Sequence, residues 1–149
     1  MSSRSSINVR PLEAGDETAW RRLWKGYLTF YEHILADEVS NETWRRLLSD
    51  DETFVGLAAL NDDQLVGFAH YILHPSTWTI GDYCYLEDLY VDPESRGHGA
   101  GRRLIEEIYR KADQSGWSRV YWTTQEFNYK ARILYDELAR RTEFVIYER

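Results

Sequence analysis

The chain has 149 residues, of which 43% are hydrophobic, 15% aromatic and 29% charged. These values are typical of one globular domain over residues 1–149 and exclude an intrinsically disordered chain. A formal net charge of −7 disfavours a nucleic-acid-binding protein, which would carry a basic face, and is compatible with a cationic amine as substrate.

A few residues bear on cellular location and metal content. Cys84 is the only cysteine, which excludes an internal disulfide, favours a cytoplasmic location and is expected in the core. Met1–Ser6 lacks the apolar segment of a secretory leader, and no apolar run is long enough to span a membrane. The histidines show no metal-ligand pattern, so no metal site is expected. They are His33, His70, His74 and His98.

The first half of the chain predicts a strand, two helices and a hairpin. Residues 7–12 alternate in polarity as a strand does, and Asp16 is a candidate N-cap for a helix with an aromatic stripe. A second, shorter helix begins near Ser40. Residues 53–60 and 65–73 predict two strands joined by a short polar link.

The second half is organised around a strand over residues 82–91, rich in aromatic and β-branched residues and ended by Asp92-Pro93. A glycine-rich loop and a helix follow, and Gly116 is expected to end that helix in a left-handed conformation. Further elements are expected over residues 118–124 (strand), 128–139 (helix) and 144–147 (strand). The order predicts an α+β fold, a mixed sheet with helices on both faces.

The glycine-rich loop, Arg96-Gly97-His98-Gly99-Ala100-Gly101, stands at the start of a helix. Free N–H groups at a helix start and the charges of Arg96 and Arg102 favour an anion, so the loop is a candidate phosphate cradle. The glycine spacing differs from the dinucleotide pattern, and the Lys-Ser/Thr pair of a P-loop is missing. A plain strand-to-helix turn is the alternative.

The pattern Arg96-x-x-Gly99-x-Gly101 after Leu-Tyr-Val-Asp-Pro resembles the acetyl-CoA motif of the GNAT superfamily of N-acetyltransferases. The segment Tyr-Leu-Glu-Asp-Leu-Tyr-Val and the later Asn128-x-x-Ala131-x-x-x-Tyr135 strengthen the resemblance, which extends from Ile7 to about Tyr147. Within the superfamily the chain is similar to polyamine and diamine acetyltransferases and to yeast HPA-type enzymes. The resemblance implies the GNAT fold, with a mostly antiparallel sheet of about six or seven strands.

The resemblance also implies where acetyl-CoA would bind as co-substrate. The pyrophosphate would lie on the N–H groups from Gly97 to Arg102, and the pantetheine arm would pair with an open strand edge. The expected contacts are Leu89, Tyr90, Val91, Arg96, Gly97, His98, Gly99, Ala100, Gly101, Arg102, Asn128 and Ala131.

Tyr135 is the candidate acid. Asn128 and Tyr135 are seven residues apart, so both lie on one helix face, with the small Ala131 between them. Tyr135 could protonate the leaving thiolate, as the resemblance implies; a core tyrosine in an apolar stripe is the alternative.

Glu87 is the candidate base, acting directly or through water, because an amine is mostly protonated at neutral pH. The match to polyamine acetyltransferases favours Glu87, whereas strand alternation predicts that Asp88 points to the opposite face. A solvated or hydrogen-bonded glutamate without a catalytic role is the alternative.

By resemblance, the acceptor amine would contact Tyr27, Tyr31, Glu32 and Glu87. The pattern alone favours the alternatives, a core aromatic stripe for the tyrosines and a solvated acid for Glu32. The apolar Phe144–Tyr147 segment predicts a homodimer, because the last strand packs against a partner in related dimers. The expected function is transfer of acetyl from acetyl-CoA to a small amine, polyamine, amino acid or protein lysine. The alternative is a regulatory module that binds acetyl-CoA without catalysis.

Overall fold

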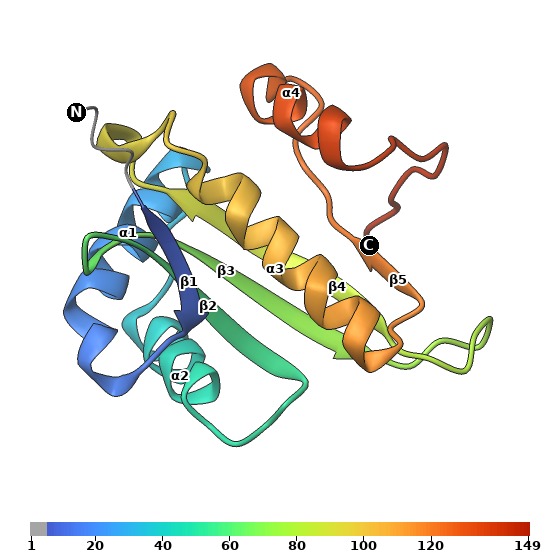
Figure 1. Cartoon of the computed structure of the whole chain (residues 1–149), viewed down its shortest axis with the longest axis horizontal. Helices are drawn as coiled ribbons and strands as arrows, with labels where there is room; N and C mark the ends of the chain where they lie inside the picture. The colour runs from blue at the N-terminus through green and yellow to red at the C-terminus, as the bar shows by residue number, and fades with distance from the viewer. Residues whose placement is uncertain (1–5) are drawn as a thin grey trace.

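The computed structural model describes residues 6–149; residues 1–5, which belong to the stretch where no secretory leader is expected, lie outside it. A strand and two helices are followed by three strands, a helix, a strand and a final helix (Figure 1). The bounds are β1 Ile7–Pro11, η1 Ala14–Asp16, α1 Glu17–Phe30, α2 Asp37–Leu47, β2 Phe54–Asn61, β3 Gln64–His74, β4 Tyr83–Val91, η2 Pro93–Ser95, α3 Ala100–Ser115, β5 Arg119–Tyr121 and α4 Tyr129–Leu138. None of the helices in residues 6–149 is both long and apolar enough to cross a membrane.

The strands form one sheet in the order β1-β2-β3-β4-β5. Neighbours pair antiparallel from β1 to β4, and β5 pairs parallel to β4, so the expected mixed, mostly antiparallel sheet is confirmed. The expected number of strands, six or seven, is wrong: within residues 6–149 the sheet has five.

The missing strand is the one expected over residues 144–147. These side chains are at least 74% exposed and the backbone is irregular, because no strand edge of the same chain lies against it. The preceding strand is also shorter than expected, since β5 covers only Arg119–Tyr121. The C-terminal segment therefore carries apolar side chains that this chain alone does not bury.

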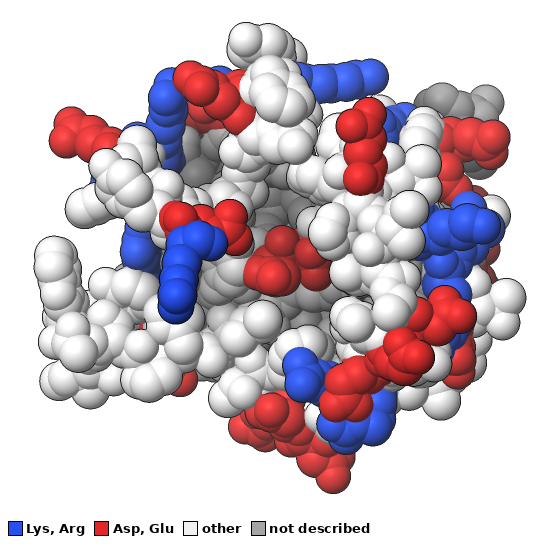
Figure 2. Space-filling model, turned by 180° about the vertical axis from the view of Figure 1, so that it is seen from behind, with Lys and Arg blue, Asp and Glu red and all other residues white. Residues whose placement is uncertain are grey.

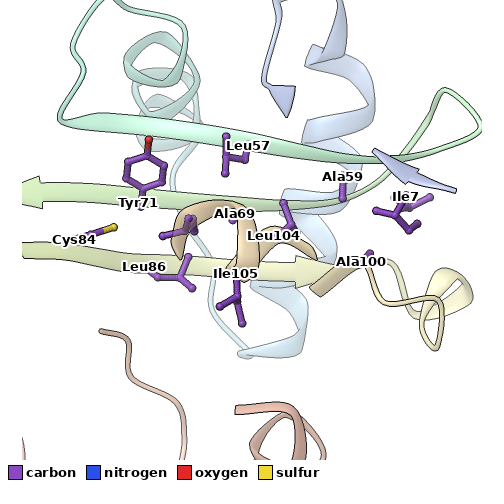
Figure 3. Packing of buried hydrophobic residues seen from close by; sticks show 12 residues of the cluster. Ile7, Leu57, Ala59, Ala69, Tyr71, Cys84, Leu86, Ala100, Leu104 and Ile105 are labelled. Carbon is purple, nitrogen blue, oxygen red and sulfur yellow. The ribbon is translucent and has the colours of Figure 1, made fainter. Parts of the chain in front are cut away.

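Helices cover both faces of the sheet, as expected. On one face α3 packs its apolar stripe, including Leu104 and Ile105, against Leu57, Ala69 and Leu86 of the strands (Figure 3). On the other face α1 and α2 bury a second cluster around Trp20 and Trp44. Cys84 is fully buried in the first cluster, which confirms its place in the core.

Of two expected helix boundaries, one is confirmed and the other lacks the expected hydrogen bond. Gly116 ends α3 with a φ of +72°, the left-handed conformation that glycine adopts freely, as predicted. Asp16 occupies the N-cap position of α1, but its side chain makes no cap hydrogen bond. Its carboxylate instead accepts two hydrogen bonds from Arg10, at 2.7 and 3.0 Å, so an ion pair has replaced the cap.

A β-bulge interrupts β4 at Glu87. Asp88 pairs with His70 of β3 and Leu86 pairs with Tyr71, so Glu87 is the extra residue between them. The bulge shifts the alternation of side chains by one position. Leu86 and Leu89 therefore both face α3, although they are three residues apart.

Candidate functional site

The site opens where β4 and β5 part. Pairing of the two strands is confined to Tyr83–Tyr85 of β4 and Arg119–Tyr121 of β5, so the later residues of β4 have no strand partner on that side. A cavity of about 370 Å³ lies there. Its walls come from the end of α1, the end of β4, the glycine-rich loop with the start of α3, and α4; they are Tyr27, Phe30, Tyr31, Leu89, Tyr90, Val91, Arg96, Gly97, Gly99, Ala100, Gly101, Arg102, Asn128, Lys130, Ala131, Leu134 and Tyr135.

The glycine-rich loop forms one wall with its backbone. Gly97 and Gly99 have φ of +88° and +83°, and Gly99 is the N-cap of α3. Other residues rarely adopt this conformation, which is why the chain needs glycine at both positions. The loop is tied to β4, because Arg96 Nε donates to the Val91 carbonyl at 3.1 Å.

Three cations line the cavity: Arg96, Arg102 and Lys130. Arg102 also pairs with Glu137 and thereby joins the start of α3 to α4. Positive side chains beside a helix N-terminus favour the binding of an anionic ligand such as a phosphate.

Tyr135 projects into the cavity from α4. Its ring contacts Trp122 edge-on at 5.4 Å between centroids. Burial raises the pKa of the Tyr135 phenol to about 12, and neighbouring Tyr31 adds to the shift. The phenol is therefore a proton donor at physiological pH. Asn128 precedes α4, and its Nδ2 donates to Thr124 Oγ1 at 3.3 Å.

The bulge brings Glu87 and Asp88 to the same side of the sheet, so the expectation that they face opposite ways is wrong. Both carboxylates act on Tyr27 of α1, whose pKa is raised mainly by burial and further by the charges of Asp88 and Glu87. Glu87 is exposed as a residue, yet partial burial of its carboxyl and the nearby charge of Asp88 raise its pKa. Figure 2, seen from the face opposite α3, shows a hollow with acidic side chains on its floor.

Behind Asp88 a chain of hydrogen bonds runs into the core. Trp20 Nε1 donates to His70 Nε2 at 3.0 Å, and His70 Nδ1 lies 2.9 Å from Asp88 Oδ2. His70 is 3% exposed and its ring stacks on Phe68 at 4.5 Å. Sequence reasoning gave neither His70 nor Asp88 a role, because nothing in the sequence locates the bulge that aligns them.

The cavity unites most of the predicted site residues. The predicted residues that do not line it are His98, Glu32 and Glu87. Glu32 is exposed at the end of α1 with a φ of +52°, where its N–H closes the helix on Thr29. The Glu32 backbone thus takes part in ending α1, and a contact of its side chain with the acceptor stays a prediction. The lining residues that were not predicted are Phe30, Lys130 and Leu134.

Comparison with known proteins identifies relatives that match nearly the whole chain. The family model described as "Acetyltransferase (GNAT) family" matches residues 18–139. The D-amino-acid N-acetyltransferase HPA3 of Saccharomyces cerevisiae is 37% identical over 145 residues, which is 96% of this chain and 90% of that protein. A thialysine N-epsilon-acetyltransferase of Sus scrofa is 40% identical over 77 residues, covering 52% of this chain and 45% of that one.

Solved structures agree in fold. The aminoglycoside N-acetyltransferase AAC(6')-Iy in complex with CoA superposes with a TM-score of 0.83 at 21% identity, covering 100% of this chain and 97% of that one. A ribosomal-protein-alanine N-acetyltransferase from Brucella melitensis gives a TM-score of 0.81 at 22% identity, over 96% and 98% of the two chains. From the family match and these relatives, the chain belongs to the GNAT acetyltransferase family and is an acyltransferase.

Proposed function

We propose that this protein transfers the acetyl group of acetyl-CoA to a primary amine. The observation that carries the proposal is the single cavity that joins the glycine-rich loop, the open edge of β4 and the Tyr135 phenol. A phosphate cradle, an edge for an extended amide chain and a proton donor are what acetyl-CoA requires of a site. The similarity to a structure solved with CoA supports the same ligand.

In this proposal the N–H groups from Gly97 to Arg102 hold the pyrophosphate, with Arg96, Arg102 and Lys130 supplying charge. The pantetheine arm lies along Leu89, Tyr90 and Val91 and reaches Asn128, beside the small Ala131. Ala100 and Gly101 leave space for the ligand at the start of α3, and His98 belongs to the same loop. An N–H of the β4 edge faces the thioester oxygen, where negative charge develops.

Chemistry follows from the groups around the thioester. Glu87, directly or through water, takes a proton from the ammonium of the acceptor, and the neutral amine attacks the carbonyl carbon. The nitrogen of the tetrahedral adduct gives up its second proton to water as the carbon–sulfur bond breaks, and Tyr135 gives its proton to the leaving thiolate. The Tyr135 phenolate then regains a proton from water. Burial raises the pKa of Tyr135 and disfavours the phenolate and the thiolate alike, so the transfer depends on the position of the phenol beside the thiolate rather than on burial.

The acceptor is an amine that enters past Tyr27 and Tyr31. Two carboxylates beside aromatic rings suit an ammonium group, through charge and cation–π attraction. Relatives named for D-amino acids and thialysine support an amino acid or another small amine as the substrate class. We further propose that residues 1–149 act as one domain, as a cytoplasmic homodimer that needs no metal.

Calorimetric binding of acetyl-CoA tests the proposal. The unaltered protein should bind, whereas Gly99→Glu should abolish binding, because a side chain strains a φ of +83° and its charge repels the pyrophosphate. Gly15→Glu is the matched control, since Gly15 is exposed with open space around it. A panel of amines read by release of free CoA then identifies the acceptor. Absence of acetyl-CoA binding would contradict the proposal; binding without turnover on any amine would favour a regulatory module.

A further inference from the structure

His70 is an ionisable side chain in the core that the proposed reaction does not use directly. It belongs to β3, is 3% exposed and lies between two polar partners from different elements. Trp20 of α1 approaches one ring nitrogen at 3.0 Å and Asp88 of β4 approaches the other at 2.9 Å. A buried polar side chain with both ring nitrogens bonded has one fixed orientation.

The partners also determine the protonation of the ring. An indole N–H only donates, so His70 Nε2 must offer its lone pair to Trp20. The proton of a neutral imidazole then resides on Nδ1, which points at the Asp88 carboxylate. Protonating the ring fully would break the bond to Trp20 and leave a buried N–H without an acceptor, which is costly.

Asp88 in turn lies near Tyr27 and Tyr31, past which the acceptor is proposed to enter. It accepts from His70 Nδ1–H, and its charge acts on Tyr27, Tyr31 and Glu87. A carboxylate that accepts a hydrogen bond from a buried donor of fixed orientation is held in place. The titratable groups that face the Glu87–Asp88 pair are Tyr27 and Tyr31 from α1, His70 from β3, Tyr85 from β4 and Tyr121 from β5.

We propose that His70 is a positioning residue for acetyl transfer: Trp20 locks it as the Nδ1–H tautomer, and its Nδ1–H holds the Asp88 carboxylate in place beside Glu87. Held there, Asp88 keeps the acceptor ammonium at Glu87, and its charge raises the pH at which Glu87 is free to take a proton. The inference rests on the proposed function, because it needs an amine that loses its proton at this pair.

The pH dependence of kcat/KM for the most active amine tests the proposal. His70→Leu removes the donor to Asp88, so the carboxyl pair should take up its first proton at higher pH. The acidic limb of the profile should move upward by about one pH unit, and kcat/KM at neutral pH should fall about tenfold. His70→Asn keeps an N–H near the Nδ1 position and should return the limb to within about 0.3 unit of the unaltered protein. Acetyl-CoA affinity should stay unchanged in both variants.

A second histidine on the same strand supplies the control. His74 lies four residues further along β3 and bonds to Tyr121 at 2.7 Å rather than to Asp88, so it reaches the carboxyl pair only through Tyr121. His74→Leu should leave the acidic limb in place. An acidic limb that does not move in His70→Leu, or that moves equally in His74→Leu, would overturn the inference. Absence of turnover with every amine in the unaltered protein would instead overturn the proposed function.

Nitrogen-15 NMR of the imidazole rings provides a test that does not depend on activity. With four histidines in the chain, the His70 signals can be assigned by comparison with His70→Asn. The unaltered protein at neutral pH should show a neutral ring protonated on Nδ1. A protonated Nε2, or an imidazolium, would contradict the proposal even if the leucine variant failed to fold.

Discussion

At the scale of single residues, Tyr135 combines the two properties that a buried proton donor needs. Its phenol lines the cavity, and its pKa of about 12 keeps the proton on it throughout the physiological range. Tyr135→Phe should therefore lower kcat about 10²–10⁴-fold, the usual contribution of a general acid, with acetyl-CoA affinity unchanged. Stopped-flow or steady-state assays beside calorimetry separate the two effects. A Tyr135→Phe variant with normal kcat would show that Tyr135 lines the cavity without donating the proton.

The same assignment predicts the alkaline side of the pH profile. Because the pKa of Tyr135 is raised rather than lowered, its proton is lost only well above neutrality. The rate should therefore show no fall due to Tyr135 until the pH approaches about 12. A basic limb that lies below this pH and disappears in Tyr135→Phe would contradict the raised pKa.

Glu87 and Asp88 give a prediction in the acidic range. Burial and the charge of Asp88 both raise the pKa of Glu87, so the base loses its function as the pH falls through a value above the ordinary range of glutamate. Asp88→Asn removes one of these causes and should move the acidic limb of kcat/KM downward. The direction is opposite to that expected for His70→Leu. An upward shift in Asp88→Asn would show that Asp88 does not act on Glu87 through its charge.

These residues also show how much of the candidate site can be predicted from the sequence alone. The glycine-rich loop, Asn128 and Tyr135 follow from fixed spacings, and the structure brings them to one cavity as predicted. The Glu87–Asp88 pair and its support by His70 could not be predicted, because one extra residue in β4 inverts the alternation on which the prediction depended. Such an insertion depends on the partner strand, which the local pattern of β4 does not reveal.

At the scale of elements, α3 and β4 meet at a close junction. A Cβ on Gly81 would lie 2.2 Å from the Gly116 carbonyl oxygen, at the point where α3 ends and β4 is about to begin. Ser118 fastens the junction, since its N–H donates to Asp82 at 2.8 Å and its hydroxyl donates to Gly81 at 3.1 Å. The parallel pairing of β5 with β4 starts directly after these bonds.

Gly81→Ala should therefore destabilise the fold, because the clash is with backbone and cannot be relieved by a side-chain rotation. We expect a loss of about 1–3 kcal/mol, measured as a lower midpoint in urea with an unchanged slope. Gly15→Ala is the matched control, since a Cβ there meets nothing within 4 Å. Equal midpoints for the two variants would show that the junction yields without cost.

The elements themselves were largely predictable. Apolar residues at helical spacing place α1 and α3, and the two strands of the hairpin agree with the expected bounds within a few residues. The exception is the last strand, expected over residues 144–147, whose apolar sequence is typical of a strand but whose hydrogen-bond partner is absent from the sheet. Strand propensity records how well a residue suits a sheet and does not supply the neighbouring edge.

At the scale of the whole molecule, the C-terminal segment exposes a run of apolar side chains. Phe144, Val145, Ile146 and Tyr147 are 80%, 74%, 74% and 93% exposed. Each would stabilise an interface by roughly 1.5–3 kcal/mol if buried. The short edge strand β5 and this apolar segment provide the unpaired edge and the apolar side chains that a second copy of the chain would cover. This is the physical basis of the proposed homodimer.

Replacing Val145 and Ile146 together with aspartate should convert the dimer into a monomer, because two charges would then be buried at the interface. Size-exclusion chromatography with light scattering measures the mass directly. Ile34→Asp is the control, since Ile34 is 94% exposed in the connection between α1 and α2, and this variant should remain dimeric. The net charge of −7 on each chain opposes association, so the dimer of the unaltered protein should tighten as salt screens this repulsion. A monomer at micromolar concentration in both low and high salt would refute the proposed dimer.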